Sequence, residues 1–236
     1  MTKKFIGGVT IETDKEMKKR HPADFYPTEQ ALLDAYFSQS FINYVPKLTI
    51  DVGAADGRWG TTFNKYNVTD TLIGIELRDY PKPKVFDYWH SGAKDYKADI
   101  YNLYSTLSIY SEIPDLFIGN PPFSIVMDIF ALCVNAVNKK RGCISFLLPL
   151  NWLASEKRGK LFMVGDELKH PVPISRINVC NTRPSFTENG KTYPGKEYMI
   201  AEWHFVNGEC LSSKDYVKHY GQSPINHLTY KREKHA

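Results

Sequence analysis

Short apolar runs alternate with amphipathic stretches along most of the chain. The apolar runs predict seven strands, at residues 47–52, 71–77, 96–100, 115–119, 143–149, 174–180 and 198–206. Apolar residues at helical spacing predict one helix that Thr28 caps, and further helices after Gly57 and after Phe123. Because strands that alternate with helices build parallel sheets covered on both faces, the pattern predicts a three-layer α/β fold with a mostly parallel sheet.

The composition is that of an ordinary globular protein with one domain. The 236 residues are 42% hydrophobic and 24% charged, so the chain can bury one sizeable core. The longest apolar run, CISFLLPLNWLA, contains Pro149 and Asn151 and is too short to cross a bilayer, and no signal peptide is visible. The four cysteines form no C-x-x-C pair, so we expect no disulfide framework and no metal site. These features predict an intracellular, cytoplasmic protein without a membrane partner.

Positive residues concentrate at the two ends of the chain, whose net charge is +4. They are Lys15, Lys18, Lys19 and Arg20 near the start, and Lys231, Arg232 and Lys234 near the end. Two interpretations stay open: the termini are simply solvated, or they are arms that contact a polyanion such as nucleic acid.

Candidate chemistry lies at the predicted strand ends, because parallel α/β sheets bind ligands at the carboxyl ends of their strands. The first such end is Asp51 followed by a turn of small residues, which lets the backbone approach a ligand closely. A dinucleotide fingerprint needs glycines at positions 53, 55 and 58. Those positions hold Gly53, Ala55 and Arg58, which weakens a nicotinamide interpretation.

The turn resembles motif I of class I S-adenosylmethionine-dependent methyltransferases. The resemblance implies that S-adenosylmethionine is the cofactor and that it contacts Asp51, Gly53, Ala54, Ala55 and Gly57. At the second strand end, the Glu76 carboxylate is suited to accept both ribose hydroxyls, although a solvent-exposed acid is the alternative. At the third strand end, the family pattern places Asp99 and Ile100 beside the adenine ring.

The fourth strand end reads Asn120-Pro121-Pro122-Phe123. Two prolines stop the strand, and they fix an amide oxygen, a backbone carbonyl and an aromatic ring in place. Two acceptors can hold an NH₂ group and favour a pyramidal nitrogen, and a ring face can stack on a base. The sequence matches the [DNS]-P-P-[YFW] motif of amino-methyltransferases, which act on adenine N6, cytosine N4 or a glutamine amide. The resemblance makes these four residues, Asn120 to Phe123, the catalytic motif, with Asn120 also near the cofactor.

Two further segments extend the resemblance. Tyr26-Pro27-Thr28 looks like motif X of N6-adenine DNA methyltransferases, which implies cofactor contacts for Tyr26 and Thr28. Residues 181–205 look like the region of small phage-type adenine methyltransferases in which R-P-x-F leads to a closing hairpin. Nucleic-acid contacts are expected at Trp152, Arg183, Phe186 and Lys191, unless Trp152 belongs to the core and the loop is merely solvated.

The sequence therefore predicts an N6-adenine DNA methyltransferase with the class I (Rossmann-like) fold, a seven-stranded sheet and an antiparallel last strand. The expected organisation is a basic arm at 1–23, a catalytic domain at 24–206 and a tail at 207–236. Methylation of adenine in RNA, methylation of a protein glutamine and an inactive scaffold remain alternatives. DNA is the expected partner, with RNA possible, and both a monomer and a homodimer stay open. A phage-encoded enzyme would act in the cytoplasm of its host.

Overall fold

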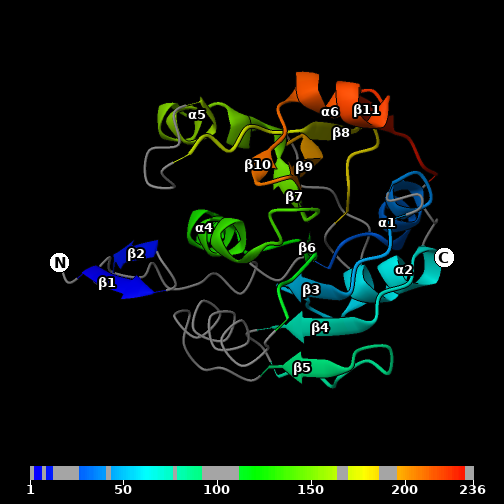
Figure 1. Cartoon of the computed structure of the whole chain (residues 1–236). Coiled ribbons are helices and arrows are strands. Elements are labelled where there is room, and N and C mark those ends of the chain that lie inside the picture. The colour runs from blue at the N-terminus through cyan, green and yellow to red at the C-terminus, as the bar shows by residue number, and fades with distance from the viewer. Residues whose placement is uncertain are drawn as a thin grey trace.

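The computed structural model describes residues 3–6, 9–12, 27–40, 44–76, 79–91, 112–163, 170–185 and 196–231. A mostly parallel sheet runs through this part of the chain (Figure 1), in the strand order β11-β8-β9-β7-β6-β3-β4-β5. These strands are β3 (Leu48–Val52), β4 (Thr71–Ile75), β5 (Tyr88–His90), β6 (Leu116–Gly119), β7 (Cys143–Pro149), β8 (Arg176–Cys180), β9 (Tyr198–Val206) and β11 (Ile225–Leu228). Strand β9 is antiparallel to both β7 and β8, and β10 (Glu209–Cys210) forms a hairpin with β9.

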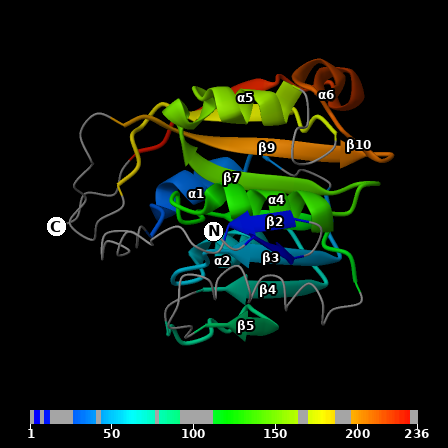
Figure 2. The ribbon, with the colours of Figure 1, turned by 90° about the vertical axis from the view of Figure 1, so that its left-hand side faces the viewer.

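Helices cover both faces of this sheet. They are α1 (Gln30–Phe37), α2 (Arg58–Tyr66), α4 (Val126–Ala136), α5 (Glu156–Met163) and α6 (Ser213–Tyr220), with a 3₁₀ turn η2 (Leu150–Leu153) after β7. Helix α4 packs on one face, and α1 and α2 pack on the other, as Figure 2 shows from the α4 side. Strands β1 (Lys3–Ile6) and β2 (Val9–Glu12) form a separate antiparallel pair, and β2 lies against α4.

The side-chain alternation in β3 determines where its acid points. Leu48, Ile50 and Val52 belong to the hydrophobic cluster on the α4 face. Because successive side chains of a strand point to opposite faces, Thr49 and Asp51 lie on the α2 face. The candidate acid is therefore turned toward the first turn of α2, which follows the glycine-rich loop.

Six of the seven predicted strands coincide with β3, β4, β6, β7, β8 and β9, and β9 has the predicted bounds. The predicted strand at 96–100 lies outside the described residues. The strand beside β4 is instead β5, which has only three residues and follows a proline-containing segment. Three residues are too few to show a strand period, so the sequence pattern did not reveal β5.

The segment after residue 206, expected to be a tail, contributes to the sheet and its cover. It forms β10, α6 and β11, and β11 pairs in parallel with β8 at the sheet edge. Ser212 caps the N-terminus of α6, where its hydroxyl accepts a hydrogen bond from the Asp215 amide at 3.2 Å, and Gly221, which has φ 65°, caps the C-terminus. The sheet thus has more strands than the seven that were predicted. Among the described residues, every helix is too short or too polar to cross a bilayer.

Candidate active site

The loops that carry the candidate residues meet at one edge of the sheet. Strands β3, β4, β5, β6, β7 and β8 share one direction, so their carboxyl ends lie at the same edge, and the antiparallel β9 begins there. The residues that follow these ends include the turn Gly53–Gly57, Glu76 and Asn120–Phe123. The sheet thus gathers residues that are up to 70 positions apart in the chain.

The glycine-rich turn after β3 lies directly against the Asn120-Pro121 backbone. A Cβ atom on Gly53 would lie 3.2 Å from the Asn120 carbonyl oxygen and 3.2 Å from Pro121 Cα, and Gly53 has φ +70°. At the end of β6, a Cβ atom on Gly119 would lie 2.3 Å from the Val52 carbonyl oxygen. Both glycines are therefore needed for this close approach, which brings the predicted cofactor turn and the predicted catalytic motif together.

Hydrogen bonds tie the turn to the neighbouring strand ends. The amides of Gly53 and Ala54 donate to the Ile75 carbonyl oxygen at 2.9 and 3.0 Å. The Ala55 amide donates to Glu76 Oε2 at 2.7 Å, and Glu76 is almost fully buried. The Glu76 carboxylate therefore holds the turn in place at the end of β4.

Asp51 is a buried acid with one unsatisfied oxygen. Its side chain is fully buried, and Oδ2 accepts the Gly60 amide of α2 at 2.8 Å. Oδ1 has no hydrogen-bond partner among the described residues. Burial raises the pKa of Asp51 to about 8, although the Gly60 hydrogen bond works in the opposite direction and the nearby Asp56 and Glu76 add to the rise. A buried carboxyl oxygen without a partner is available for a hydrogen bond with a ligand.

Arg58, at the position where a dinucleotide fingerprint has its third glycine, connects the turn to the Thr28 segment. Its guanidinium forms an ion pair with Asp56 at 2.5 Å and donates to the Thr28 carbonyl oxygen at 2.9 Å. The next residue, Trp59, donates from Nε1 to Thr28 Oγ1 at 2.8 Å. The structure thus brings Thr28 to the glycine-rich turn, and it adds Arg58 as a residue of the site that sequence reasoning passed over as a mere departure from the fingerprint.

The prediction that Thr28 caps the first helix is wrong. Helix α1 begins after Glu29, and no side-chain capping hydrogen bond is made there. The Thr28 hydroxyl instead accepts a hydrogen bond from the Trp59 indole, because the two residues pack together in the interior.

Phe123 is a partly buried ring at the end of the catalytic motif. Its ring centroid lies 6.4 Å from that of Tyr198, the first residue of β9, with a 34° angle between the planes. Phe123 also packs against the hydrophobic clusters on both faces of the sheet. The ring is therefore anchored by the core, and its stacking on a target base remains a prediction.

Trp152 does not form part of an exposed binding surface. Only 6% of the residue is exposed, and its ring packs on Phe130, Phe162 and Trp203. The structure assigns Trp152 to the core, which corrects the expectation of a nucleic-acid contact. Trp152 is the buried residue of η2, and the sequence of that segment alone did not decide this.

Arg183 lies at the same sheet edge and forms an ion pair with Glu197. The remaining predicted residues, Tyr26, Asp99, Ile100, Phe186 and Lys191, lie outside the described residues.

The strand next to β4 ends at His90, whose backbone carbonyl accepts a hydrogen bond from the Glu76 amide at 2.8 Å. Burial lowers the pKa of His90, and its Nε2 has no partner in the described part of the chain. His90 is thus a candidate residue that the sequence pattern missed, because β5 is so short.

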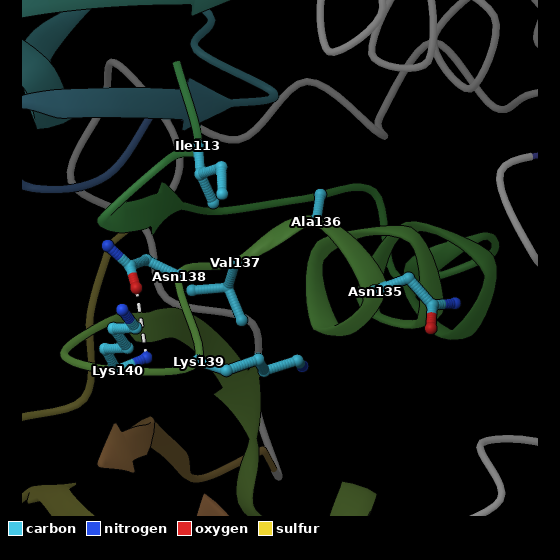
Figure 3. A pocket seen from close by; sticks show the side chains of 7 residues that line it. All are labelled: Ile113, Asn135, Ala136, Val137, Asn138, Lys139 and Lys140. Carbon is cyan, nitrogen blue, oxygen red and sulfur yellow. Dashed lines mark hydrogen bonds between the residues drawn. The ribbon is translucent and has the colours of Figure 1, made fainter. Parts of the chain in front are cut away.

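Two of the pockets in the described part of the chain lie at opposite edges of the sheet. The larger, of about 550 Å³, is lined by Ile113 and residues 135–140 at the end of α4 (Figure 3), near the start of β6 and β7. It therefore lies at the edge of the sheet opposite the candidate site. The smaller, of about 330 Å³, is lined by Leu150, Asn151, Lys196 and Glu197. It borders the edge where the candidate residues meet.

No protein-family model matches the sequence, and no curated protein is significantly similar to it. Solved structures do resemble the fold. A protein provisionally described as a class I S-adenosylmethionine-dependent methyltransferase from Listeria monocytogenes matches with a TM-score of 0.56 at 13% identity, over 90% of this chain and 68% of that one. A protein provisionally described as a hemolysin from Lactococcus lactis matches with a TM-score of 0.50 at 11% identity, over 84% of this chain and 99% of that one.

At such low identity the likeness shows the fold alone. Together with the strand order and the antiparallel β9, it establishes the class I methyltransferase (Rossmann-like) fold that the sequence predicted.

Proposed function

We propose that this protein transfers a methyl group from S-adenosylmethionine to the exocyclic N6 amino group of adenine in DNA, with the target base flipped into the Asn120–Phe123 site. The observation that carries this proposal is the contact between the Gly53 turn and the Asn120-Pro121 backbone. A methyl donor bound at the turn and an amino group bound at the motif would then be neighbours, as direct transfer requires.

The residues of the turn suit this cofactor. Asp51 offers a buried oxygen without a partner, Glu76 offers a carboxylate at the next strand end, and Gly53 lets the turn lie close to the Asn120-Pro121 backbone. Further contacts are proposed for Tyr26, Thr28, Ala54, Ala55, Gly57, Asp99 and Ile100, on the resemblance to the family's motifs. Bound S-adenosylmethionine supplies a methyl group on a positively charged sulfur, which departs as a neutral thioether.

The Asn120-Pro121 segment has the groups that a planar amino nitrogen needs. The lone pair of the adenine amino nitrogen is delocalised into the adenine ring, so this nitrogen is a poor nucleophile. The Asn120 side-chain oxygen and the Pro121 carbonyl oxygen accept the two amino hydrogens and favour a pyramidal nitrogen. The new N–C bond forms as the C–S bond breaks, and the nitrogen then loses one proton to water. Pro121 and Pro122 keep the two acceptors rigid, so little conformational entropy is lost on binding.

DNA is the proposed polymer because of the motif X-like segment and the basic ends of the chain. Incubation with tritiated S-adenosylmethionine and, in parallel, unmethylated genomic DNA, total RNA or protein tests this choice. Nucleoside analysis is expected to find the label in N6-methyladenine from DNA. If only RNA or only protein is labelled, that polymer is the substrate in place of DNA. If no sample is labelled, the enzymatic proposal is overturned.

A further inference from the structure

The Arg183–Glu197 ion pair lies at the edge of the sheet that carries the candidate site. Arg183 follows β8, and Glu197 immediately precedes the antiparallel neighbour β9, so the two residues face each other at this edge. The Glu197 carbonyl oxygen also accepts the Leu150 amide at 2.8 Å, which fixes Glu197 at the end of β7. The side chains of Arg183 and Glu197 are 35% and 52% exposed. The pair is thus well positioned and open to solvent.

A pocket of about 330 Å³ adjoins this ion pair. Its lining consists of an apolar side chain, an amide, an ammonium and a carboxylate, from Leu150, Asn151, Lys196 and Glu197. The residue after Glu197 is Tyr198, whose ring packs on Phe123 of the catalytic motif. The pocket therefore lies one residue away from the ring that contacts the proposed target site, and its volume is in the range of small-ligand sites.

We propose that this pocket receives the nucleotide next to the methylated adenine, with Lys196 and Arg183 on its phosphates, and that Glu197 holds Arg183 until a phosphate replaces it. This inference rests on the proposed function, because it requires a nucleic-acid substrate. Asn151 contributes an amide that can both donate to and accept from the edge of a base.

The exchange of Glu197 for phosphate is physically favourable. An ion pair between exposed side chains stabilises a protein little, so its loss on binding costs little. A guanidinium binds phosphate through two parallel charge-assisted hydrogen bonds, which makes phosphate a stronger partner. Arg183 Nε is buried, so a phosphate would meet the terminal nitrogens of the guanidinium, one of which Glu197 holds in the ion pair. Until the exchange, the Glu197 carboxylate keeps this cation ordered at the pocket.

The test measures binding of a short fluorescent single-stranded oligonucleotide with one adenine, by anisotropy over a range of salt concentrations. Arg183→Ala is expected to weaken binding about tenfold and Lys196→Ala roughly threefold, because each removes a phosphate contact. Each should also reduce the slope of log affinity against log salt by about 0.7. Glu197→Gln is expected to tighten binding roughly threefold, and this gain should vanish in the Arg183→Ala background.

Matched controls carry the same charge changes at the opposite edge of the sheet. Lys214→Ala in α6 and Glu209→Gln in β10 are exposed substitutions, and each should change affinity less than about twofold. Binding of S-adenosylhomocysteine checks that every variant is folded. A gain of affinity in Glu197→Gln cannot arise from misfolding, so this variant is decisive even if Arg183→Ala is unstable.

The inference is overturned if Arg183→Ala and Lys196→Ala change affinity as little as Lys214→Ala does, and Glu197→Gln gives no gain in affinity. If wild-type protein still labels DNA in that case, the proposed function stands and only the pocket assignment fails. If wild-type protein neither binds the oligonucleotide nor labels DNA, the proposed function fails, and the pocket assignment fails with it.

Discussion

The carbonyl oxygen of Asn120 lies 3.2 Å from the position that a Cβ atom would occupy on Gly53, which has φ +70°. Gly53→Ala should therefore push the two loops apart and place alanine in a left-handed conformation, which alone costs about 1–2 kcal/mol. We expect a lower unfolding midpoint and a loss of methyl transfer of at least about tenfold, since reacting groups tolerate little misplacement. Thermal unfolding and tritium transfer measure the two effects.

Gly159→Ala provides the matched control for that substitution. Gly159 lies within α5, and a Cβ atom there would meet nothing within 4 Å. Because alanine favours helix over glycine, the control should gain about 0.5–1 kcal/mol and keep full transfer. Equal effects of the two substitutions would contradict the close approach described for Gly53.

Asn120→Ala removes the proposed side-chain acceptor of the amino group and leaves the turn after β3 intact. We expect transfer to fall by about 10²-fold or more, with cofactor affinity nearly unchanged, because the lost interaction acts on the reacting nitrogen. Single-turnover transfer and calorimetric titration with S-adenosylmethionine measure the two quantities. An equal loss of cofactor affinity would assign Asn120 to cofactor binding instead.

The pKa of Asp51, raised by burial to about 8 from the ordinary aspartate value of 3.8, predicts a pH-dependent stability. Between these values the folded state binds more protons than the unfolded state, so wild-type stability should fall as the pH rises from about 4 to 8. Asp51→Asn has no such titration. At pH 8 without ligand it should be more stable than wild type by at least about 1 kcal/mol, and at pH 4 this advantage should disappear.

Chemical unfolding of both proteins between these pH values tests this prediction. Parallel stability curves would show that the Asp51 carboxyl titrates normally. The same substitution should weaken binding of S-adenosylmethionine, because a cationic ligand favours the ionised form of the Asp51 carboxyl, which asparagine cannot provide. Unchanged affinity in this variant and in Glu76→Ala would contradict the proposed cofactor site.

Glu202 is the centre of a buried polar cluster that the proposed chemistry does not use. Its carboxylate accepts from Tyr36 Oη at 2.9 Å and Asn178 Nδ2 at 2.7 Å, and its other oxygen lies 2.7 Å from His204 Nε2. Burial favours the neutral acid, but the His204 and Tyr36 hydrogen bonds and the Arg176 charge outweigh it and lower the pKa of Glu202. The ionised form therefore contributes stability at neutral pH.

Glu202→Gln should destabilise the protein by about 3 kcal/mol at pH 7, because it leaves buried Arg176 without its counter-charge. The pKa of Glu202 is depressed below its unfolded value, so its contribution is complete above about pH 4.5 and is lost as the pH falls through the folded pKa. The two proteins should thus converge in stability below pH 4.5 in denaturant titrations. Exposed Glu209→Gln is the control, and a constant difference at all pH values would contradict the prediction.

Ala55 occupies the left-handed region with φ 52°, a conformation that favours glycine. Ala55→Gly should relieve this strain and raise the free energy of unfolding by about 0.5–1 kcal/mol, because the strain outweighs the entropy that glycine loses on folding. The unfolding midpoint in denaturant measures this change. A decrease would mean that the packing of the Ala55 methyl group is worth more than the relieved strain.

Local sequence carried much of the fold and part of the candidate site. A buried parallel strand is an apolar run that ends at residues unable to continue it. The sequence therefore predicted the end of β3 at Asp51-Val52-Gly53 and the end of β6 at Gly119-Asn120-Pro121. The alternation of strands and helices then implied that these ends share one edge of the sheet. The sequence by itself therefore determined which residues stand at the strand ends and in which order.

Only the tertiary structure decided what those residues touch. Thr28 bonds to Trp59 and Arg183 pairs with Glu197 through contacts between separate elements, and no local period encodes such a contact. The inward turn of Trp152 and the addition of β11 at the sheet edge depend likewise on which apolar surfaces meet. Strand ends follow from the backbone's own hydrogen-bonding limits, whereas partners, burial and shifted pKa values arise when distant surfaces exclude water together.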